Sequence, residues 1–155
     1  MNSHQIICSM CGNPRQFTLK ECPYCGETDF LSDADAQVKA FTINLESGLP
    51  TIDEAFLRFE HYLTRLQNTG IRLIKVIHGQ GSTGQTGKIK KAFRDAMDYG
   101  KWTNAIAEVY YGEVLKPGLS GLEELRRSHP TLAKGITLDM HGNSGITVLI
   151  LFKDF

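Results

Sequence analysis

Four cysteines, confined to the first 25 residues of a 155-residue chain, form two C-x-x-C pairs. The pairs are Cys8-Ser-Met-Cys11 and Cys22-Pro-Tyr-Cys25. A C-x-x-C pair bends the backbone so that two thiolates face one cation, and two pairs complete the tetrahedron that a structural zinc prefers. We therefore predict that Cys8, Cys11, Cys22 and Cys25 bind one zinc ion, with iron in a rubredoxin-like site as the alternative.

The ten residues between the two pairs are enough for a short hairpin, and residues 1–29 resemble a zinc ribbon. A unit of this size cannot bury a core unaided, so metal binding would supply its folding energy. Disulfides fit less well because cytosolic thiols are kept reduced. The small and acidic residues 30–39 are a predicted linker, and a second domain is expected over 40–155.

The second stretch that could do chemistry is rich in glycine and runs from His78 to Lys88. A glycine-rich loop exposes backbone N–H groups, and at a helix N-terminus the helix dipole also favours an anion such as phosphate. The window 71–102 carries seven basic and two acidic residues, a local charge of +5 in a chain with no net charge. We predict that phosphates are held by Gly79, Gln80, Gly81, Ser82, Lys88, Lys90, Lys91 and Arg94, with the basic helix face turned to solvent.

Two other phosphate motifs compete for this loop. The Walker A pattern fails twice, because Ser82 replaces its first glycine and Ile89 its final hydroxyl residue. The dinucleotide fingerprint G-x-G-x-x-G is met by Gly79, Gly81 and Gly84, but the 71 residues that follow are too few for a doubly wound fold. A dinucleotide-binding enzyme remains an alternative that rests on the glycines alone.

Hydrophobic patterns predict the elements that position this loop. Strands are expected at 41–45 and 71–77. Capping boxes that begin at Thr51 and Ser120 start two helices, and a further helix follows the glycine-rich loop. The predicted fold class is α/β, an α+β two-layer sandwich with a mixed sheet in β-α-β-α-β-β order behind the zinc ribbon. The variable segment 113–137 is expected either to cover the loop or to cover a sheet edge.

The run Leu73–Ser82, an apolar strand that ends in His-Gly-Gln-Gly-Ser, resembles the strand-HGxGxG signature of the small MutS-related (Smr) domain family. Gly142–Leu151 is similar to the closing strand of that family. The elements over about 40–152 follow in the family's order, with Ala105–Tyr111 as the third strand that the resemblance implies. The resemblance implies a nucleic-acid-binding domain, which in several members is an endonuclease. It carries over His78 as the loop histidine, which would contact phosphate, transfer a proton or only close a buried strand.

The nuclease motif of that family, LDxH at the end of the first strand, is degenerate here. It aligns with Ile43-Asn44-Leu45-Glu46, and an asparagine cannot accept a proton as aspartate does. Glu46 is an alternative base or metal ligand. The same tetrapeptide stands instead at Leu138-Asp139-Met140-His141. On a strand, Asp139 and His141 would share a face and could rebuild a catalytic set with His78, unless the match is a coincidence in a hairpin.

Composition restricts the class of protein. Hydrophobic residues make up 41% and charged residues 22%, values typical of soluble globular domains. No apolar run approaches the ~20 residues of a membrane span, and no secretory signal is visible, so we expect a cytoplasmic location. Trp102, Tyr110 and Tyr111 could stack on bases, although aromatics on strands usually pack in cores.

The function expected from these patterns is nucleic-acid binding by an Smr-like protein with a structural zinc. Its partners would be the DNA or RNA phosphate backbone, in ribosome-associated or repair complexes, and not a membrane. The alternative is an Smr-type endonuclease that acts on structured DNA or RNA with a rearranged active site. The Asn44 and Glu46 departure favours binding without catalysis, whereas the family background favours the nuclease.

Overall fold

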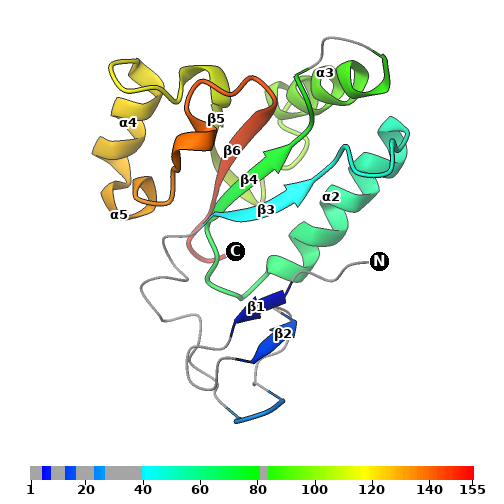
Figure 1. The fold of residues 1–155 in the computed structure, drawn as a ribbon, viewed down its shortest axis with the longest axis vertical. Coiled ribbons are helices and arrows are strands. Elements are labelled where there is room, and N and C mark those ends of the chain that lie inside the picture. The colour runs from blue at the N-terminus through cyan, green and yellow to red at the C-terminus, as the bar shows by residue number, and fades with distance from the viewer. Residues whose placement is uncertain (1–4, 8–12, 17–22, 27–39, 81–83) are drawn as a thin grey trace.

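A computed structural model describes residues 5–7, 13–16, 23–26, 40–80 and 84–155 of the chain (Figure 1). In the N-terminal part, strands β1 (Gln5–Ile7) and β2 (Pro14–Gln16) pair antiparallel, with Ile6 opposite Arg15. A turn at residues 23–25 follows them in the chain.

The predicted zinc ligands fall mostly outside this description. Cys8, Cys11 and Cys22 lie outside the described residues, as does the predicted linker 30–39, while Cys25 is exposed. No group of three or more metal-binding side chains occurs among the residues that are described. Because three of the four cysteines lie outside the described residues, zinc binding stays a prediction.

The C-terminal part is built on a four-stranded mixed sheet with the strand order β3-β4-β6-β5. The strands are β3 (Phe41–Asn44), β4 (Leu73–Ile77), β5 (Ile106–Tyr111) and β6 (Ile146–Leu151). β3 and β4 run parallel, and β6 lies antiparallel between β4 and β5. The predicted α/β class with a mixed sheet is confirmed.

Two long helices cover one face of the sheet. α2 (Ile52–Leu66) follows β3, and α3 (Gly84–Asp98) follows β4 (Figure 1). The rings of Phe59 on α2 and Phe93 on α3 meet edge to face at 5.0 Å, and Trp102 packs against both at 4.6 and 5.6 Å. Aromatic pairs in this geometry bury large apolar areas, so the three rings fix the two helices on the sheet.

The opposite face is covered by the segment between β5 and β6, which gives the fold a third layer. This segment contains η2 (Gly112–Val114), α4 (Ser120–Ser128), α5 (Pro130–Ala133) and η3 (Leu138–Met140). Leu125, Leu132 and Met140 pack there in a cluster with Val148 and Ile150 of β6. The prediction of a two-layer sandwich is therefore wrong in this respect, because helices lie on both sides of the sheet (Figure 1). All six positions of β6 are buried, so both of its faces need a cover. The predicted variable segment supplies the second cover.

Several segments end at the same edge of the sheet. β3, β4 and β5 all point the same way, since the first two are parallel and β6 is antiparallel to both β4 and β5. Their carboxyl ends therefore meet at one edge, together with the start of β6 and the beginnings of α2 and α3. In open α/β sheets this is the edge at which ligands bind.

The longest described helices, α2 and α3, have 15 residues each. No helix in the described ranges is long and apolar enough to cross a membrane.

Candidate functional site

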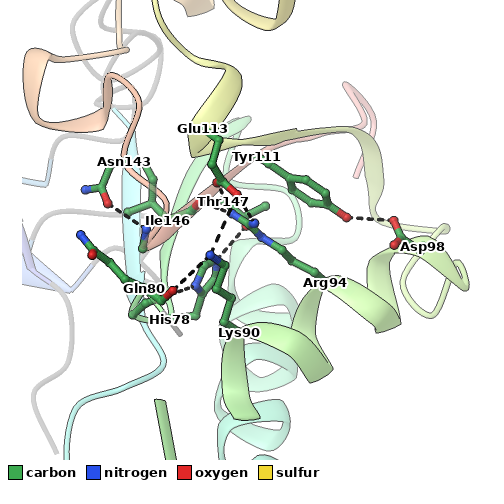
Figure 2. A network of polar contacts seen from close by, with 12 residues as sticks. His78, Gln80, Lys90, Arg94, Asp98, Tyr111, Glu113, Asn143, Ile146 and Thr147 are labelled. Atoms are coloured by element: carbon green, nitrogen blue, oxygen red, sulfur yellow. Dashed lines mark hydrogen bonds and ion pairs between the residues drawn. The ribbon is translucent and has the colours of Figure 1, made fainter. Parts of the chain in front are cut away.

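His78 stands at the centre of a polar network at this edge of the sheet (Figure 2). Its side chain is buried, and its ring lies 6.0 Å from that of Phe93, on the face covered by α3. Nδ1 is 2.8 Å from the carbonyl oxygen of Gly79, and Nε2 is 2.8 Å from Oγ1 of Thr147. A carbonyl only accepts hydrogen bonds, so Nδ1 must carry the proton and the Thr147 hydroxyl must donate to Nε2.

Burial sets the charge of His78. Desolvation disfavours the imidazolium and lowers the pKa of His78 to about 4, and the positive charges of Arg94 and Lys90 act in the same direction. The ring is therefore neutral at pH 7, with both nitrogens occupied by protein atoms. In this arrangement His78 joins β4, through Thr147, to β6.

Arg94 extends the network from α3. Its guanidinium makes two hydrogen bonds to the carboxylate of Glu113, at 2.6 and 2.7 Å. It also donates to the carbonyl oxygen of Ile146 at 3.1 Å and, from Nε, to Oγ1 of Thr147 at 3.4 Å. The guanidinium lies 4.3 Å from the ring centre of Tyr111. The side chain is only 13% exposed, so Arg94 belongs to the structure of the site and not to the solvent-facing helix surface that was predicted.

Glu113 is the counter-ion of this site and was not anticipated from the sequence. Hydrogen bonds from Arg94 hold the pKa of Glu113 below its usual value. Lys90 approaches the same carboxylate at 3.9 Å and donates to the backbone carbonyl of Gln80 at 3.2 Å. The positive charge of the predicted basic surface is therefore partly neutralised, because Lys90 and Arg94 both face the carboxylate of Glu113.

Tyr111 closes the site on the side of β5. Its hydroxyl donates to Asp98 at 2.8 Å, and burial together with this hydrogen bond raises the pKa of Tyr111 to about 12. Tyr110 is buried on the other face and donates to Glu108, while Trp102 packs in the core. The alternative that these aromatics are structural is the one that the contacts favour.

The turn before β6 fits closely against the glycine-rich loop. The N–H groups of His78 and Gly79 both donate to the carbonyl of Gly145, and the side chain of Asn143 accepts from the N–H of Gly145. Gly79 has a φ of 84°, in the left-handed region that favours glycine. At Gly112, an added Cβ would lie 1.8 Å from the carbonyl oxygen of Asn143. Glycine is therefore required at both positions by the path of the backbone.

The remaining predicted phosphate-binding residues are distributed around the loop. Lys88 is exposed and makes no polar contact within the described part of the chain. Lys91 is exposed and pairs with Asp95 one turn further along α3 at 2.9 Å. Gln80 is exposed, whereas Gly81 and Ser82 lie outside the described residues.

The degenerate LDxH position has a structural role. The side-chain oxygen of Asn44 accepts hydrogen bonds from the N–H groups of Glu46 and Ser47, at 3.0 and 3.1 Å. The side chain thus forms the turn that leads from β3 toward α2, as asparagine commonly does. Arg58 of α2 donates to the carbonyls of Asn44 and Ser47 and holds this turn from the helix side.

The second LDxH tetrapeptide does not form a strand. Leu138–Met140 is the short 3₁₀ helix η3, and His141 follows it directly. Asp139 forms an ion pair with Lys75 at 2.7 Å and accepts from Thr137. Lys75 alternates with Ile74 and Val76, which pack on the α2/α3 face, so the ion pair lies on the opposite face of the sheet from His78. The proposed catalytic grouping of His78 with Asp139 and His141 is therefore not formed, and the Lys75 ammonium holds the pKa of Asp139 below its usual value.

Three functional residues were missed in the sequence, and one of them left a signal. Thr147 is a polar residue within a strand whose six positions are all buried, and a buried hydroxyl needs a partner. Glu113 and Asn143 lie in the segment between β5 and β6, where polar residues are common and their presence in the sequence does not indicate a site. Only the fold brings them to His78 and Arg94.

Comparison with protein-family models, with curated proteins and with solved structures gave no match to this chain.

Proposed function

We propose that this protein binds the phosphate backbone of nucleic acid at the N-terminal end of α3, without cleaving it. The observation that carries the proposal is the charge at the start of the two helices: the first turn of α2 holds Asp53 and Glu54, whereas α3 begins without a carboxylate. The first turn of α3 contains no acidic residue, and exposed Lys88 follows it without a polar partner in the described part of the chain. A helix N-terminus with a free cation beside it attracts phosphate through both the dipole and the charge.

Two further cations of α3, Lys90 and Arg94, lie close to this site but are held by other groups of the protein. Lys90 lies against the backbone of Gln80 in the glycine-rich loop, and its charge is fixed at the base of the loop. Arg94 is paired with the carboxylate of Glu113, so its charge is largely balanced within the protein and its role in the site is structural. We therefore assign direct phosphate contact to Lys88 and to the loop, with Lys90 as a supporting charge. Contacts of this kind are independent of sequence and weaken steeply as salt rises.

Binding without catalysis is favoured because, among the described residues, the groups that the sequence offered for catalysis are engaged in other contacts, Glu46 excepted. His78 is buried, its pKa is about 4, and both ring nitrogens are engaged. Asn44 is committed to a turn, and Asp139 is paired with Lys75. A general base needs an accessible atom within hydrogen-bond reach of its substrate.

Two further parts of the proposal rest on the sequence. The resemblance of Leu73–Ser82 and Gly142–Leu151 to the Smr family supports a nucleic acid as ligand in place of a small phosphate compound. The two C-x-x-C pairs support a structural zinc in the N-terminal segment. Metal analysis of the purified chain should find about one zinc per chain, and Cys25→Ser should lower that content.

Fluorescence anisotropy with labelled single-stranded and structured RNA and DNA tests the main proposal. Lys88→Glu should weaken binding by about five- to tenfold, because the exposed cation becomes an anion, and the slope of affinity against salt should become shallower. Lys134→Glu is the matched control, since Lys134 is exposed beyond α5 and has no polar partner in the described ranges. Equal losses in the two variants would reject the site.

The same samples test the absence of catalysis. End-labelled RNA and branched DNA should remain intact with and without divalent metal. Cleavage that disappears in His78→Gln, at unchanged affinity, would establish an endonuclease and overturn the non-catalytic assignment.

A further inference from the structure

A groove runs along the edge of β5 and shares Asp98 and Tyr111 with the polar network around Arg94. The cavity has a volume of about 490 Å³, and four consecutive residues of β5, Glu108 to Tyr111, line its floor. One wall is Asp98 at the end of α3, and the other is the start of α4, from Ser120 to Glu124. Within this groove Val109 is exposed, Glu108 and Tyr111 are half-buried, and Tyr110 is buried.

The hydrogen bonds of the sheet show which backbone groups face this groove. His78 N–H donates to Gly145, and Leu151 N–H donates to Arg72, so the odd-numbered residues of β6 bond to β4. The even-numbered residues of β6 therefore bond to β5, where Val148 stands opposite Tyr110. The intervening residues of β5, Val109 and Tyr111, then direct their N–H and C=O groups away from the sheet. No strand of the described part of the chain pairs with them.

The charge of the groove indicates what could pair with this edge. Its lining includes the carboxylates of Asp98, Glu108 and Glu124 and no lysine or arginine. Glu108 accepts from His129, and Asp98 accepts from Tyr111, whereas Glu124 makes no polar contact within the described residues. Val109 and Val114 are more than one-third exposed in the same groove and offer apolar contacts.

We propose that the β5 edge binds an extended basic peptide segment of a partner protein, which adds a fifth strand to the sheet. Backbone hydrogen bonds to Val109 and Tyr111 would give affinity, and the carboxylates would select lysine or arginine side chains. A second copy of this chain fits less well, because two copies paired through this edge would bring their like-charged carboxylates together.

The probe is a fluorescein-labelled peptide of about eight residues that alternates lysine and valine, matched to the length of a short strand. Two comparison peptides separate the contribution of charge from that of backbone hydrogen bonds. One has glutamate in place of lysine, and the other is N-methylated at every second residue. The N-methylated peptide keeps the charge but loses the backbone donors of one edge. We expect the lysine peptide to bind the full chain, the N-methylated peptide to bind at least about tenfold more weakly, and the glutamate peptide not to bind.

Variants and hydrogen exchange locate the binding. Glu124→Gln should weaken the lysine peptide by about threefold, whereas Glu123→Gln, its neighbour on α4 outside the groove lining, should not. Val109→Pro removes an outward N–H from an edge strand and should abolish binding; if that variant fails to fold, the N-methylated peptide makes the same test in the native chain. The peptide should slow exchange of the Val109 and Tyr111 amides, and Lys88→Glu should leave peptide binding unchanged.

Three results would overturn the proposal. One is the absence of binding at about 1 mM peptide, and another is equal binding of the N-methylated peptide, which would show charge attraction alone. The third is a dimer of the free chain in sedimentation, with the Val109 and Tyr111 amides already protected, which would assign the edge to a second copy.

Discussion

The two parallel β–α units of the sheet, β3–α2 and β4–α3, share a topology but differ in the chemistry of the connection. At the start of α2, Thr51 caps the helix by accepting from the N–H of Glu54, and Asp53 and Glu54 place negative charge in the first turn. At the start of α3 the first turn has no acidic residue, and Lys88 follows it. Acidic side chains thus complement the dipole of the first helix, whereas the first turn of the second helix contains none.

The arginines of the two units extend this contrast. Arg58 of α2 binds the carbonyls of Asn44 and Ser47, in the turn directly before its own helix. Arg94 of α3 binds Glu113 and Thr147, which come from β5 and β6 segments later in the chain. The first unit is closed by local contacts, whereas the second is held by residues distant in the sequence.

The largest expected effect concerns the pH dependence that His78 gives to the second unit. Its pKa is about 4 in the folded protein and 6.5 in an unfolded chain, so the unfolded state takes up the proton first as pH falls. The stability that His78 contributes is complete above pH 6.5 and is lost as pH falls toward 4. Urea denaturation should show a loss of about 2–3 kcal/mol between pH 7 and pH 4.5 that is absent in His78→Gln.

His61→Gln is the control for the first unit, because His61 is exposed on α2. It should keep the full pH dependence of the native protein. A pH profile of His78→Gln that matches the native one would show that the neutral, buried histidine does not set the acid sensitivity.

The next effect compares the two arginines. Arg94→Ala should lower the free energy of unfolding by about 2 kcal/mol, because it removes the paired hydrogen bonds to Glu113 and those to Thr147 and the Ile146 carbonyl. Arg58→Ala removes hydrogen bonds to two carbonyls near solvent and should cost about 1 kcal/mol. Lys91→Ala, which breaks the exposed pair with Asp95, should leave the denaturation midpoint unchanged. Equal losses for Arg94 and Arg58 would remove the distinction between the two units.

The helix cap of the first unit has a smaller expected effect. Thr51→Ala should destabilise the protein by about 1 kcal/mol, since the N–H of Glu54 loses its acceptor, and Thr51→Ser should restore it. Thermal or chemical unfolding measures both. A loss that serine does not rescue would point to the packing of the methyl group in place of the cap.

The smallest effect on stability is also the sharpest test of the contrast. Gln85→Glu places a carboxylate in the first turn of α3, as Asp53 does in α2, and should stabilise the protein by about 0.3–0.5 kcal/mol. The same substitution should weaken nucleic-acid binding, because the new carboxylate competes with phosphate. Higher stability with unchanged affinity would move the binding site away from this helix end.

Local sequence determined much of the first unit and of the sheet. The predicted cap at Thr51 forms, because its hydroxyl and the N–H of Glu54 lie three residues apart and need only the helix itself, and the Glu54 carboxylate reaches back to accept from the Thr51 hydroxyl. The strands 41–45 and 71–77 were recognisable because alternation and continuous apolar runs follow directly from burial on one or two faces. At Ser120 the same capping pattern misled, since α4 begins there with Leu119 as the N-cap and no side-chain cap. The packing of the surrounding segment decided that helix end.

The tertiary structure alone decided the second unit. The tetrapeptide at Asp139 allowed a catalytic pair on a strand, with coincidence as the alternative, and the structure instead shows the segment turning through η3 with Asp139 paired to Lys75. Arg94 was assigned to a solvent face by its helical position, yet Glu113 and Thr147 draw it inward. Such pairings join residues far apart in the chain. The sequence shows the charge and hydrogen-bonding capacity of each residue, but it does not show which of them lie close together in the folded protein.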